Sequence, residues 1–311
     1  MQASKRYCLL TNDVETTSIV NNTLSDKMGE RVLKEGIPLL LDLYSEYNIK
    51  ATFFFTGYIA EKFPDVVRMV LPYGHEVASH GYSHKVDKAF DILSYEKQIE
   101  HLKKSKQILE NIAGQEVISF RAPAARVNKD TASALVETGF KIDSSIASQR
   151  FDMFLSFGGI KKLRWLTAPR TPYFTNKENL MIRGNGDIFE IPISALLMPY
   201  IGTTLRIFPF ASRQLRKILA YESGLNGKPI VFLTHPNEFI DEESDGNKVA
   251  RRSSNYISYL LGDVIRRQLK LKNLGTKALP LYRREIEYFK NKGFEFVTCK
   301  EYYNIYNKKE G

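Results

Sequence analysis

The chain has 311 residues, of which 43% are hydrophobic and 26% are charged, and its net charge at pH 7 is +10. This composition is typical of globular proteins and excludes disordered and collagen-like chains. The apolar runs, such as residues 37–41, are far shorter than the ~20 residues of a membrane-spanning helix. The first ten residues lack the long apolar region of a secretory signal, and the chain has only two cysteines. We therefore expect a cytoplasmic protein, with peripheral contact to the inner face of the membrane as an open alternative.

Apolar, β-rich runs alternate with helical patterns along the chain. A strand is predicted over residues 6–11, and an amphipathic helix over 31–47, where apolar residues recur at helical spacing. The segment ATFFFT at 51–56 is a buried strand, and Pro64 is expected to interrupt the helix at 58–71. The remaining predicted strands are 76–80, 118–121, 141–145, 188–193, 230–234 and 295–298. The remaining predicted helices are 94–113, 129–138, 255–274 and 281–292.

Strands separated by helices of this length indicate a parallel sheet with crossover helices. Seven or eight such units predict an α/β fold of the distorted (β/α)7–8 barrel type. No repeat or linker divides the chain, so we expect a single catalytic domain over residues 1–311, with additional covering helices. Residues 151–186 are rich in Gly, Pro and Lys, and we expect them to form a long loop over one end of the barrel.

The positive charge is concentrated before the last predicted strand. Residues 246–284 hold ten Lys and Arg but one acid, Asp263, a net charge of +9. This basic helical segment predicts an anionic neighbour. We favour an anionic membrane surface or a phosphate-linked substrate over nucleic acid, and a merely solvated face of covering helices is the alternative.

Two histidines with i, i+4 spacing, His80 and His84, flank a flexible glycine. Two imidazoles and one carboxylate make a metal site that leaves positions open for water and substrate. Asp13 and Glu15 follow the first strand and are candidates for the carboxylate. Non-haem iron oxygenases also use such a ligand set, but on all-β folds, which the predicted alternation of strands and helices contradicts.

Position strengthens this hypothesis, because the candidate residues follow predicted strands or, for Asp143, lie within one. In parallel barrels, catalytic groups converge at the carboxyl ends of the strands. Three further residues belong to this set: Arg121, Asp143 and His235. We expect the two other histidines, His75 and His101, to be structural or solvated.

These motifs resemble, in order, those of the polysaccharide deacetylases (carbohydrate esterase family 4). Asp13-Val14-Glu15 is similar to the first motif of the family, and His80-Gly81-Tyr82-Ser83-His84 to the second. Arg121-Ala122-Pro123 is similar to the third, and Leu233-Thr234-His235 is one residue shorter than the late Leu-x-x-His motif. Because Val14 separates the two acids, the first motif resembles the Asp-x-Asp/Glu branch of the family, which includes cytosolic peptidoglycan-deacetylase-like proteins. The usual glycine of the third motif and the Asp-Trp pair of the fourth are missing; Trp165 is the sole tryptophan.

The resemblance implies a role for each residue. Glu15, His80 and His84 would hold a divalent metal, with Zn²⁺ as the first choice and Co²⁺, Ni²⁺ or Mn²⁺ as alternatives, although Val14 leaves open whether Asp13 or Glu15 is the ligand. Otherwise Asp13 would be the general base paired with Arg121, and His235 would protonate the departing amine. Asp143 would orient His235 or hold a loop. Ala124, Trp165 and Tyr173 are the candidates for substrate binding.

The implied activity is removal of an N-acetyl group from an amino sugar. The substrate would be a lipid- or nucleotide-linked precursor of a surface polysaccharide or lipopolysaccharide. A deformylase or a cyclic amide hydrolase of the same superfamily is the alternative. Retention of the full set of metal and acid–base residues argues against a non-hydrolytic binding module.

Overall fold

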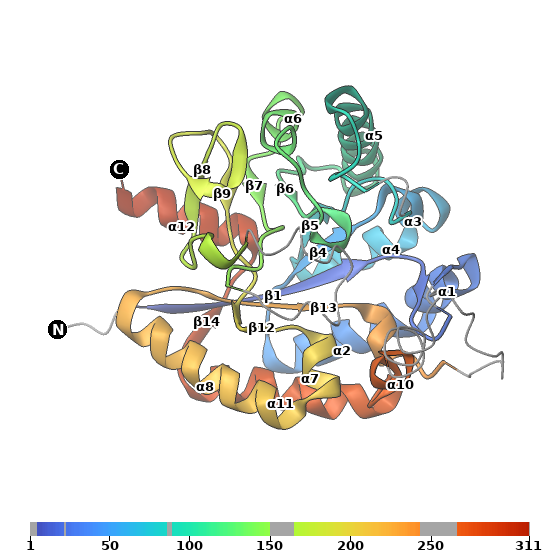
Figure 1. The fold of residues 1–311 in the computed structure, drawn as a ribbon. Coiled ribbons are helices and arrows are strands. Elements are labelled where there is room, and N and C mark those ends of the chain that lie inside the picture. Colours follow the sequence, from blue (N-terminus) through green and yellow to red (C-terminus); the bar gives the residue numbers. More distant parts are fainter. Residues whose placement is uncertain (1–4, 22, 86–88, 150–164, 243–265, 311) are drawn as a thin grey trace, which may run out of the picture.

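The computed structural model describes residues 5–21, 23–85, 89–149, 165–242 and 266–310. Within these residues the main sheet has ten strands, in the order β13-β1-β4-β5-β6-β7-β10-β8-β9, with β14 also paired to β1 (Figure 1). The parallel strands are β1 (Arg6–Val14), β4 (Thr52–Phe55), β5 (Glu76–Ser79), β6 (Ser119–Phe120), β7 (Ile142–Asp143), β10 (Phe189–Glu190), β13 (Ile230–Thr234) and β14 (Phe294–Phe296).

The sheet curls until the chain that follows β10 meets β13. The backbone N–H of Ser194 donates to the carbonyl of Val231 at 3.1 Å, and Ile201 forms a parallel bridge with Leu233. The sheet is therefore a distorted β/α barrel, and the predicted fold class is confirmed.

Strand β1 lies at the centre of this sheet, and all of its residues except Arg6 are buried. A strand buried on both faces has a nearly continuous apolar sequence, as β1 has up to Leu10. Alternate residues of a strand point to the same face. Tyr7 and Leu9 belong to the apolar cluster inside the barrel, and Asp13 follows them in the same alternation at the carboxyl end.

Helices surround the barrel, and α12 closes its amino end, where Tyr302 packs edge-on against Tyr7 with ring centroids 5.7 Å apart (Figure 1). The described helices are α1 (Asp26–Arg31), α2 (Ile37–Tyr47), α3 (Gly57–Lys62), α4 (Asp65–Arg68), α5 (Tyr95–Ala113), α6 (Thr131–Glu137), α7 (Gly202–Ile207), α8 (Pro209–Asn226), α10 (Arg266–Leu271), α11 (Ala278–Asn291) and α12 (Cys299–Glu310). A π-helical turn, Val32–Gly36, joins α1 to α2. None of these described helices is both long and apolar enough to cross a membrane.

Local sequence accounts for the helix ends. The side chain of Ser94 accepts a hydrogen bond from the N–H of Lys97 and caps α5, which ends at Gly114 in the left-handed conformation. The predicted interruption at Pro64 is also confirmed, because α3 ends at Lys62 and α4 begins at Asp65.

Several segments differ from the sequence-based expectations. The predicted loop over 151–186 is wrong for its second half, because β8 (Tyr173–Asn176) and β9 (Asn179–Arg183) form an antiparallel hairpin that extends the sheet. Helices α7 and α8 were not predicted, and neither were two small hairpins. These are β2 (Thr17–Ser18) with β3 (Thr23–Leu24), and β11 (Ala195–Leu196) with β12 (Met198–Pro199). Of the predicted helix 255–274, residues 255–265 lie outside the described residues, and α10 occupies Arg266–Leu271.

Candidate active site

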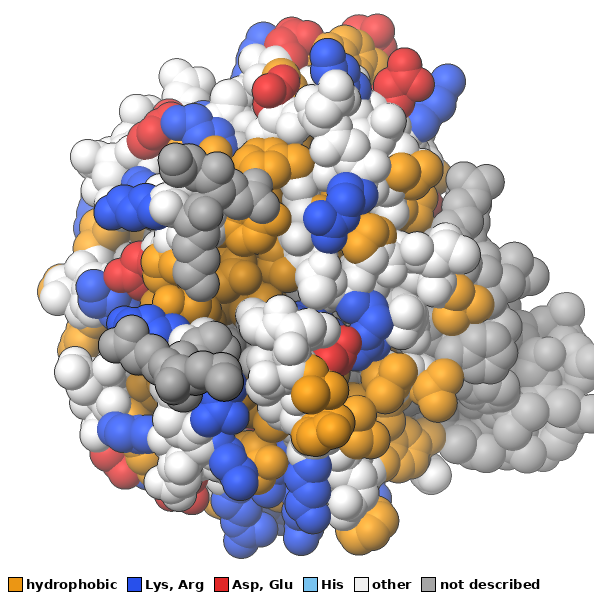
Figure 2. Space-filling model, turned by 90° about the vertical axis from the view of Figure 1, so that its left-hand side faces the viewer, with side chains coloured by type: hydrophobic (Ala, Val, Ile, Leu, Met, Phe, Trp, Pro, Cys, Tyr) orange, Lys and Arg blue, Asp and Glu red, His pale blue; other side chains and the backbone are white. Residues whose placement is uncertain are grey.

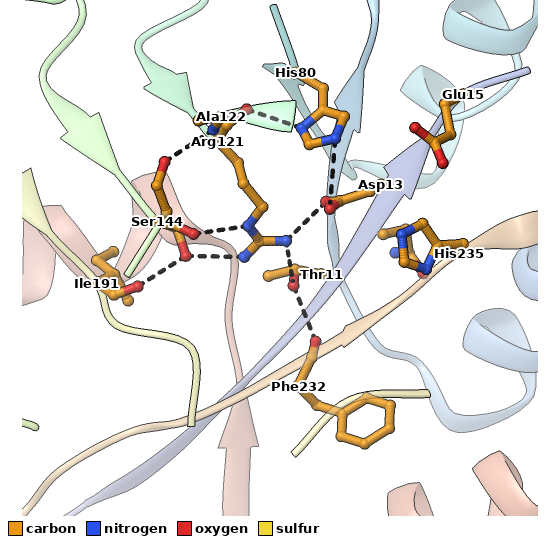
Figure 3. Close-up of polar contacts among 12 residues, drawn as sticks. Thr11, Asp13, Glu15, His80, Arg121, Ala122, Ser144, Ile191, Phe232 and His235 are labelled. Carbon is orange, nitrogen blue, oxygen red and sulfur yellow. Dashed lines mark hydrogen bonds and ion pairs between the residues drawn. The ribbon is translucent and has the colours of Figure 1, made fainter. Parts of the chain in front are cut away.

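The carboxyl ends of the strands carry a buried ion pair between Asp13 and Arg121. Arg121 donates from Nη1 to Asp13 Oδ1 at 2.8 Å, and both side chains are at least 95% buried (Figure 3). Burial would raise the pKa of the Asp13 carboxyl, but the neighbouring Arg121 guanidinium holds it below its usual value. Asp13 is therefore ionised at neutral pH and fixed in position.

Arg121 is held from several sides. Its Nε donates to the carbonyl of Ser144 and its Nη2 to the Ser144 hydroxyl, each at 2.8 Å (Figure 3). Nη1 also donates to Thr11 Oγ1 at 2.9 Å, and the guanidinium lies 4.3 Å from the ring centroid of Phe54. These contacts fix the orientation of the Arg121 guanidinium. No sequence signal identified Ser144 or Thr11 as its partners.

His80 has a defined tautomer. Its Nδ1 lies 2.8 Å from the carbonyl oxygen of Arg121 (Figure 3), and because a carbonyl can only accept, Nδ1 carries the proton. Burial lowers the pKa of His80 to about 4, so the ring is neutral. Its Nε2 then presents a lone pair toward the site, which is the form of histidine that binds a metal.

Glu15 and His84 meet beside this nitrogen. Glu15 Oε2 lies 3.1 Å from His84 Nε2, yet this buried oxygen has no hydrogen-bond partner. Ligand atoms of Glu15, His80 and His84 all lie within 4.8 Å of one another. A buried carboxylate oxygen without a hydrogen-bond donor, facing two imidazoles, fits a divalent cation such as Zn²⁺. The three predicted ligands are thus brought together, while Asp13 pairs with Arg121.

His235 stands on the other side of Asp13 (Figure 3). Behind it lies Glu238, whose Oε1 is 4.0 Å from His235 Nδ1. Glu238 is almost fully buried, accepts hydrogen bonds from Thr203 and Thr234 and pairs with Arg206 at 3.2 Å. Burial would raise the pKa of Glu238, but Arg206 and His235 hold it below its usual value. The sequence analysis missed Glu238, although its i+3 spacing from His235 was a usable signal.

Asp143 and Ala124 lie near the site in supporting positions. Asp143 is buried and accepts a hydrogen bond from the Ser145 hydroxyl at 2.6 Å, and that hydroxyl accepts one from the N–H of Ala122 at 2.8 Å. This arrangement matches the loop-holding alternative for Asp143. Ala124 lies in the turn after β6 with φ of +53°, a left-handed conformation that is uncommon for a residue with a side chain.

Trp165 and Tyr173, the two aromatic residues predicted to bind substrate, are buried in the core. Trp165 is 3% exposed and packs in the hydrophobic core. Tyr173 has no exposed surface, and its hydroxyl donates to the carbonyl of Leu180 inside the β8–β9 hairpin. Neither side chain offers a surface to a ligand, because each fills a core position that its local sequence does not reveal.

A cavity of about 620 Å³ is lined in part by Ser83 and Lys85, the sequence neighbours of His84. Two tyrosines line it: Tyr58 donates to Asp26 at 2.8 Å, and Tyr82 donates to Glu61 at 2.7 Å. Lys104 lies 3.8 Å above the ring centroid of Tyr82. The cavity therefore presents aromatic rings and charged groups next to the chain segment that carries His84.

Comparison with known proteins agrees with this geometry. Residues 15–142 match the polysaccharide deacetylase family. This part of the chain, less than half of its length, is thus similar to the polysaccharide deacetylases. The match includes Glu15, His80, His84 and Arg121, so the family predicted from the motifs is confirmed.

Curated relatives match part of the chain. The chain is 33% identical over 116 residues to a peptidoglycan deacetylase of Helicobacter pylori, covering 37% of this chain and 39% of that protein. It is 33% identical over 108 residues to a peptidoglycan-N-acetylglucosamine deacetylase of Bacillus cereus, covering 35% of this chain and 38% of that protein. The matches thus span well under half the length of these relatives.

Solved structures share the fold. The probable polysaccharide deacetylase of Pseudomonas aeruginosa PAO1 aligns with a TM-score of 0.56 and 16% identity, covering 94% of this chain and 89% of that chain. Puue allantoinase aligns with a TM-score of 0.57 and 16% identity, covering 94% and 88%. At this identity, the likeness concerns the fold alone.

Proposed function

We propose that this protein is a metal-dependent hydrolase of the polysaccharide deacetylase family that removes an N-acetyl group from an amino sugar. The convergence of Glu15, His80 and His84 on one point, with Asp13 next to His80 and His235 beyond Asp13, is the observation that carries the proposal. When bound by Glu15, His80 and His84, a divalent ion, with Zn²⁺ as our first choice, would polarise the amide carbonyl and acidify the attacking water.

Two residues of the chain would carry out the two proton transfers of the reaction, one as base and one as acid. Asp13 accepts the proton of the attacking water, and Arg121 keeps this carboxylate ionised and in place. His235 donates a proton to the nitrogen as the carbon–nitrogen bond breaks, and the Glu238 carboxylate lies 4.0 Å behind it. The turn that holds Ala124 would supply a backbone N–H to the developing oxyanion.

We propose that the substrate is a lipid- or nucleotide-linked precursor of a surface polysaccharide or lipopolysaccharide, processed in the cytoplasm by one catalytic domain. Two buried cysteines without a disulfide, Cys8 and Cys299, support a reducing compartment. The cavity next to the chain segment that carries His84 would receive a neighbouring part of the substrate, with Tyr58 and Tyr82 as its aromatic walls. The basic segment 246–284 would bind the phosphate groups of the carrier or an anionic membrane.

Mass spectrometry of Zn-loaded protein incubated with nucleotide-linked, lipid-linked and oligomeric N-acetyl sugars tests the proposed reaction. We expect the loss of one acetyl mass from at least one of these substrates. Loss of a formyl mass from formylated amino sugars, or opening of a cyclic amide, with no deacetylation would replace the proposal with the alternative activity.

Elemental analysis tests the metal separately from the activity. We expect bound metal in the wild type and its loss in His84→Ala. His75→Ala is the matched control, because His75 lies at the opposite end of β5 and should leave the metal content unchanged. Equal metal in all three proteins would remove His84 from the ligand set.

A further inference from the structure

The outer face of α8 exposes an unusual set of apolar side chains. Phe210, Tyr221 and Leu225 are each 69–70% exposed, Ile218 is 49% exposed, and Phe208, just before the helix, is 42% exposed. Positions 210, 218, 221 and 225 recur at helical spacing, so these four side chains form one stripe. The inner face is occupied by the buried residues Ser212, Leu215, Leu219, Ala220 and Ser223. Several large apolar side chains exposed on one helix face mark an interaction surface.

Cations lie along one side of this stripe. Arg213 and Lys217 are both exposed. Arg216 reaches α11, where it pairs with Glu285 at 2.7 Å and donates to the carbonyl of the exposed Arg284. The lower part of Figure 2, where α8 and α11 run in Figure 1, shows hydrophobic side chains beside several Lys and Arg side chains.

The single acid of α8 does not offset these cations. Glu222 is ion-paired with Arg170 and with Lys228, the latter at 3.2 Å. The outward charge of the helix is therefore positive, and its stripe of Phe, Ile, Tyr and Leu lies next to that charge.

We infer that α8 docks the protein on the headgroup region of an anionic lipid bilayer. An apolar stripe flanked by Arg and Lys, on a helix that cannot span the membrane, is the pattern of a helix that lies in the interface. The aromatic and aliphatic side chains would enter the headgroup and acyl boundary, while Arg213 and Lys217 meet lipid phosphates. The side chains assigned to lipid contact all lie on α8, outside the sequence range 246–284, and the inference does not depend on deacetylase activity.

Charge argues against a second copy of the chain as the occupant. Two copies paired through α8 would bring Arg213, Lys217 and Arg284 of each near those of the other, while Glu222 is already used within each chain. An anionic bilayer, in contrast, supplies both the negative charge and the apolar environment that this face lacks.

Co-sedimentation of the full chain with vesicles tests the inference. We expect binding to phosphatidylcholine vesicles that contain phosphatidylglycerol in about a 3:1 ratio, weakening with salt, and little binding to pure phosphatidylcholine. Arg213→Ala with Lys217→Ala should weaken binding about 30-fold, because each basic residue near an anionic surface contributes about 1 kcal/mol and 1.4 kcal/mol corresponds to tenfold. Phe210→Ser with Tyr221→Ser and Leu225→Ser should weaken binding to both kinds of vesicle.

Lys129→Ala with Lys177→Ala is the matched control, since it removes two exposed lysines from the turn before α6 and from the β8–β9 turn, on the opposite side of the barrel (Figure 1). An unchanged unfolding midpoint in each variant shows that folding is intact. If the control variant loses as much vesicle binding as the α8 variants, the binding depends on the overall charge of the protein and not on α8. If both α8 variants bind as well as the wild type, another surface contacts the vesicles. The absence of binding to anionic vesicles at low salt would overturn the inference.

Discussion

Asp13 and Glu15 are separated by one residue but have opposite surroundings. Asp13 faces the guanidinium of Arg121, whereas Glu15 has a buried oxygen without a hydrogen-bond donor and faces His84. The sequence placed both acids at the end of the first strand but could not distinguish them, because the partners that differ, Arg121 and His84, come from other strands. This difference assigns them distinct roles in the proposed reaction.

Asp13→Asn should abolish turnover while leaving the metal bound. Asparagine is nearly isosteric with aspartate but cannot accept the water proton, and loss of a general base typically lowers the rate by ~10²–10⁴-fold. Glu15, His80 and His84 are untouched, so elemental analysis should find nearly the wild-type metal content. The measurement is kcat on the substrate identified by mass spectrometry. Activity within a few-fold of the wild type would mean that another group takes the proton.

His235→Ala should also reduce kcat, for a different reason. The variant removes the proton donor for the departing nitrogen, so its deficit should be larger for amides with poor leaving groups. Comparing kcat for substrates whose amines differ in basicity separates this role from a structural one. A deficit that does not vary with the leaving group would argue against His235 as the acid.

Close contact between elements also shapes the site. The turn after β13, which carries His235 and Glu238, packs against the start of α7 at Gly202. A Cβ built on Gly202 would lie 1.9 Å from Glu238 Oε2 and 2.7 Å from Thr234 Oγ1. Gly202 therefore allows the buried carboxylate to approach the helix, and this packing depends on segments that are more than thirty residues apart.

Gly202→Ala should lower both stability and turnover, because the added methyl group must displace Glu238 from its position behind His235. Gly224→Ala is the matched control. Gly224 is exposed on α8 with no atom within 4 Å of a built Cβ, so alanine there should stabilise the helix by about 0.5–1 kcal/mol. Thermal unfolding and kcat of both variants are the measurements. Equal behaviour of the two would show that the approach of Glu238 to α7 has no functional effect.

Elements that the sequence predicted share a clear local pattern, whereas those it missed do not. The run Ala51–Phe55 is apolar and short, and it became β4. In α8, the exposed residues Phe210, Tyr221 and Leu225 place apolar side chains on the outside as well as the inside, so no one-sided helical pattern appears. The β8–β9 hairpin was hidden by the polar turn and by the Gly and Pro content around it.

At the scale of the whole molecule, the barrel could be predicted because each strand–helix unit has its own signal and because parallel strands must bring their carboxyl ends to one rim. The motif residues Glu15, His80, His84 and Arg121 converge there. The supporting contacts of Ser144 and Glu238, and the burial of Trp165 and Tyr173, depend on packing between distant segments. Apart from the i+3 spacing between His235 and Glu238, local sequence carries no information on these contacts.

The opposite end of the barrel contains a buried histidine that affects the stability of the whole fold. His75 is 4% exposed and accepts a hydrogen bond from the N–H of Ala51 at Nδ1, 3.1 Å away. The rings of Tyr44 and Phe53 lie 5.6 and 5.2 Å from its own, centroid to centroid. Burial, assisted by the charge of Lys50, lowers the pKa of His75 to about 4.

This shift predicts a pH dependence of stability. Because the usual histidine pKa is about 6.5, the unfolded chain binds a proton below that pH that the folded chain does not bind until about pH 4. The contribution of His75 is therefore fully present above pH 6.5 and is lost progressively as the pH falls toward 4. His75→Gln cannot titrate, so its free energy of unfolding should fall less steeply between pH 7 and 5 than that of the wild type, whatever its absolute stability. Urea unfolding at several pH values measures both slopes, and parallel slopes would show that His75 keeps an ordinary pKa in the folded protein.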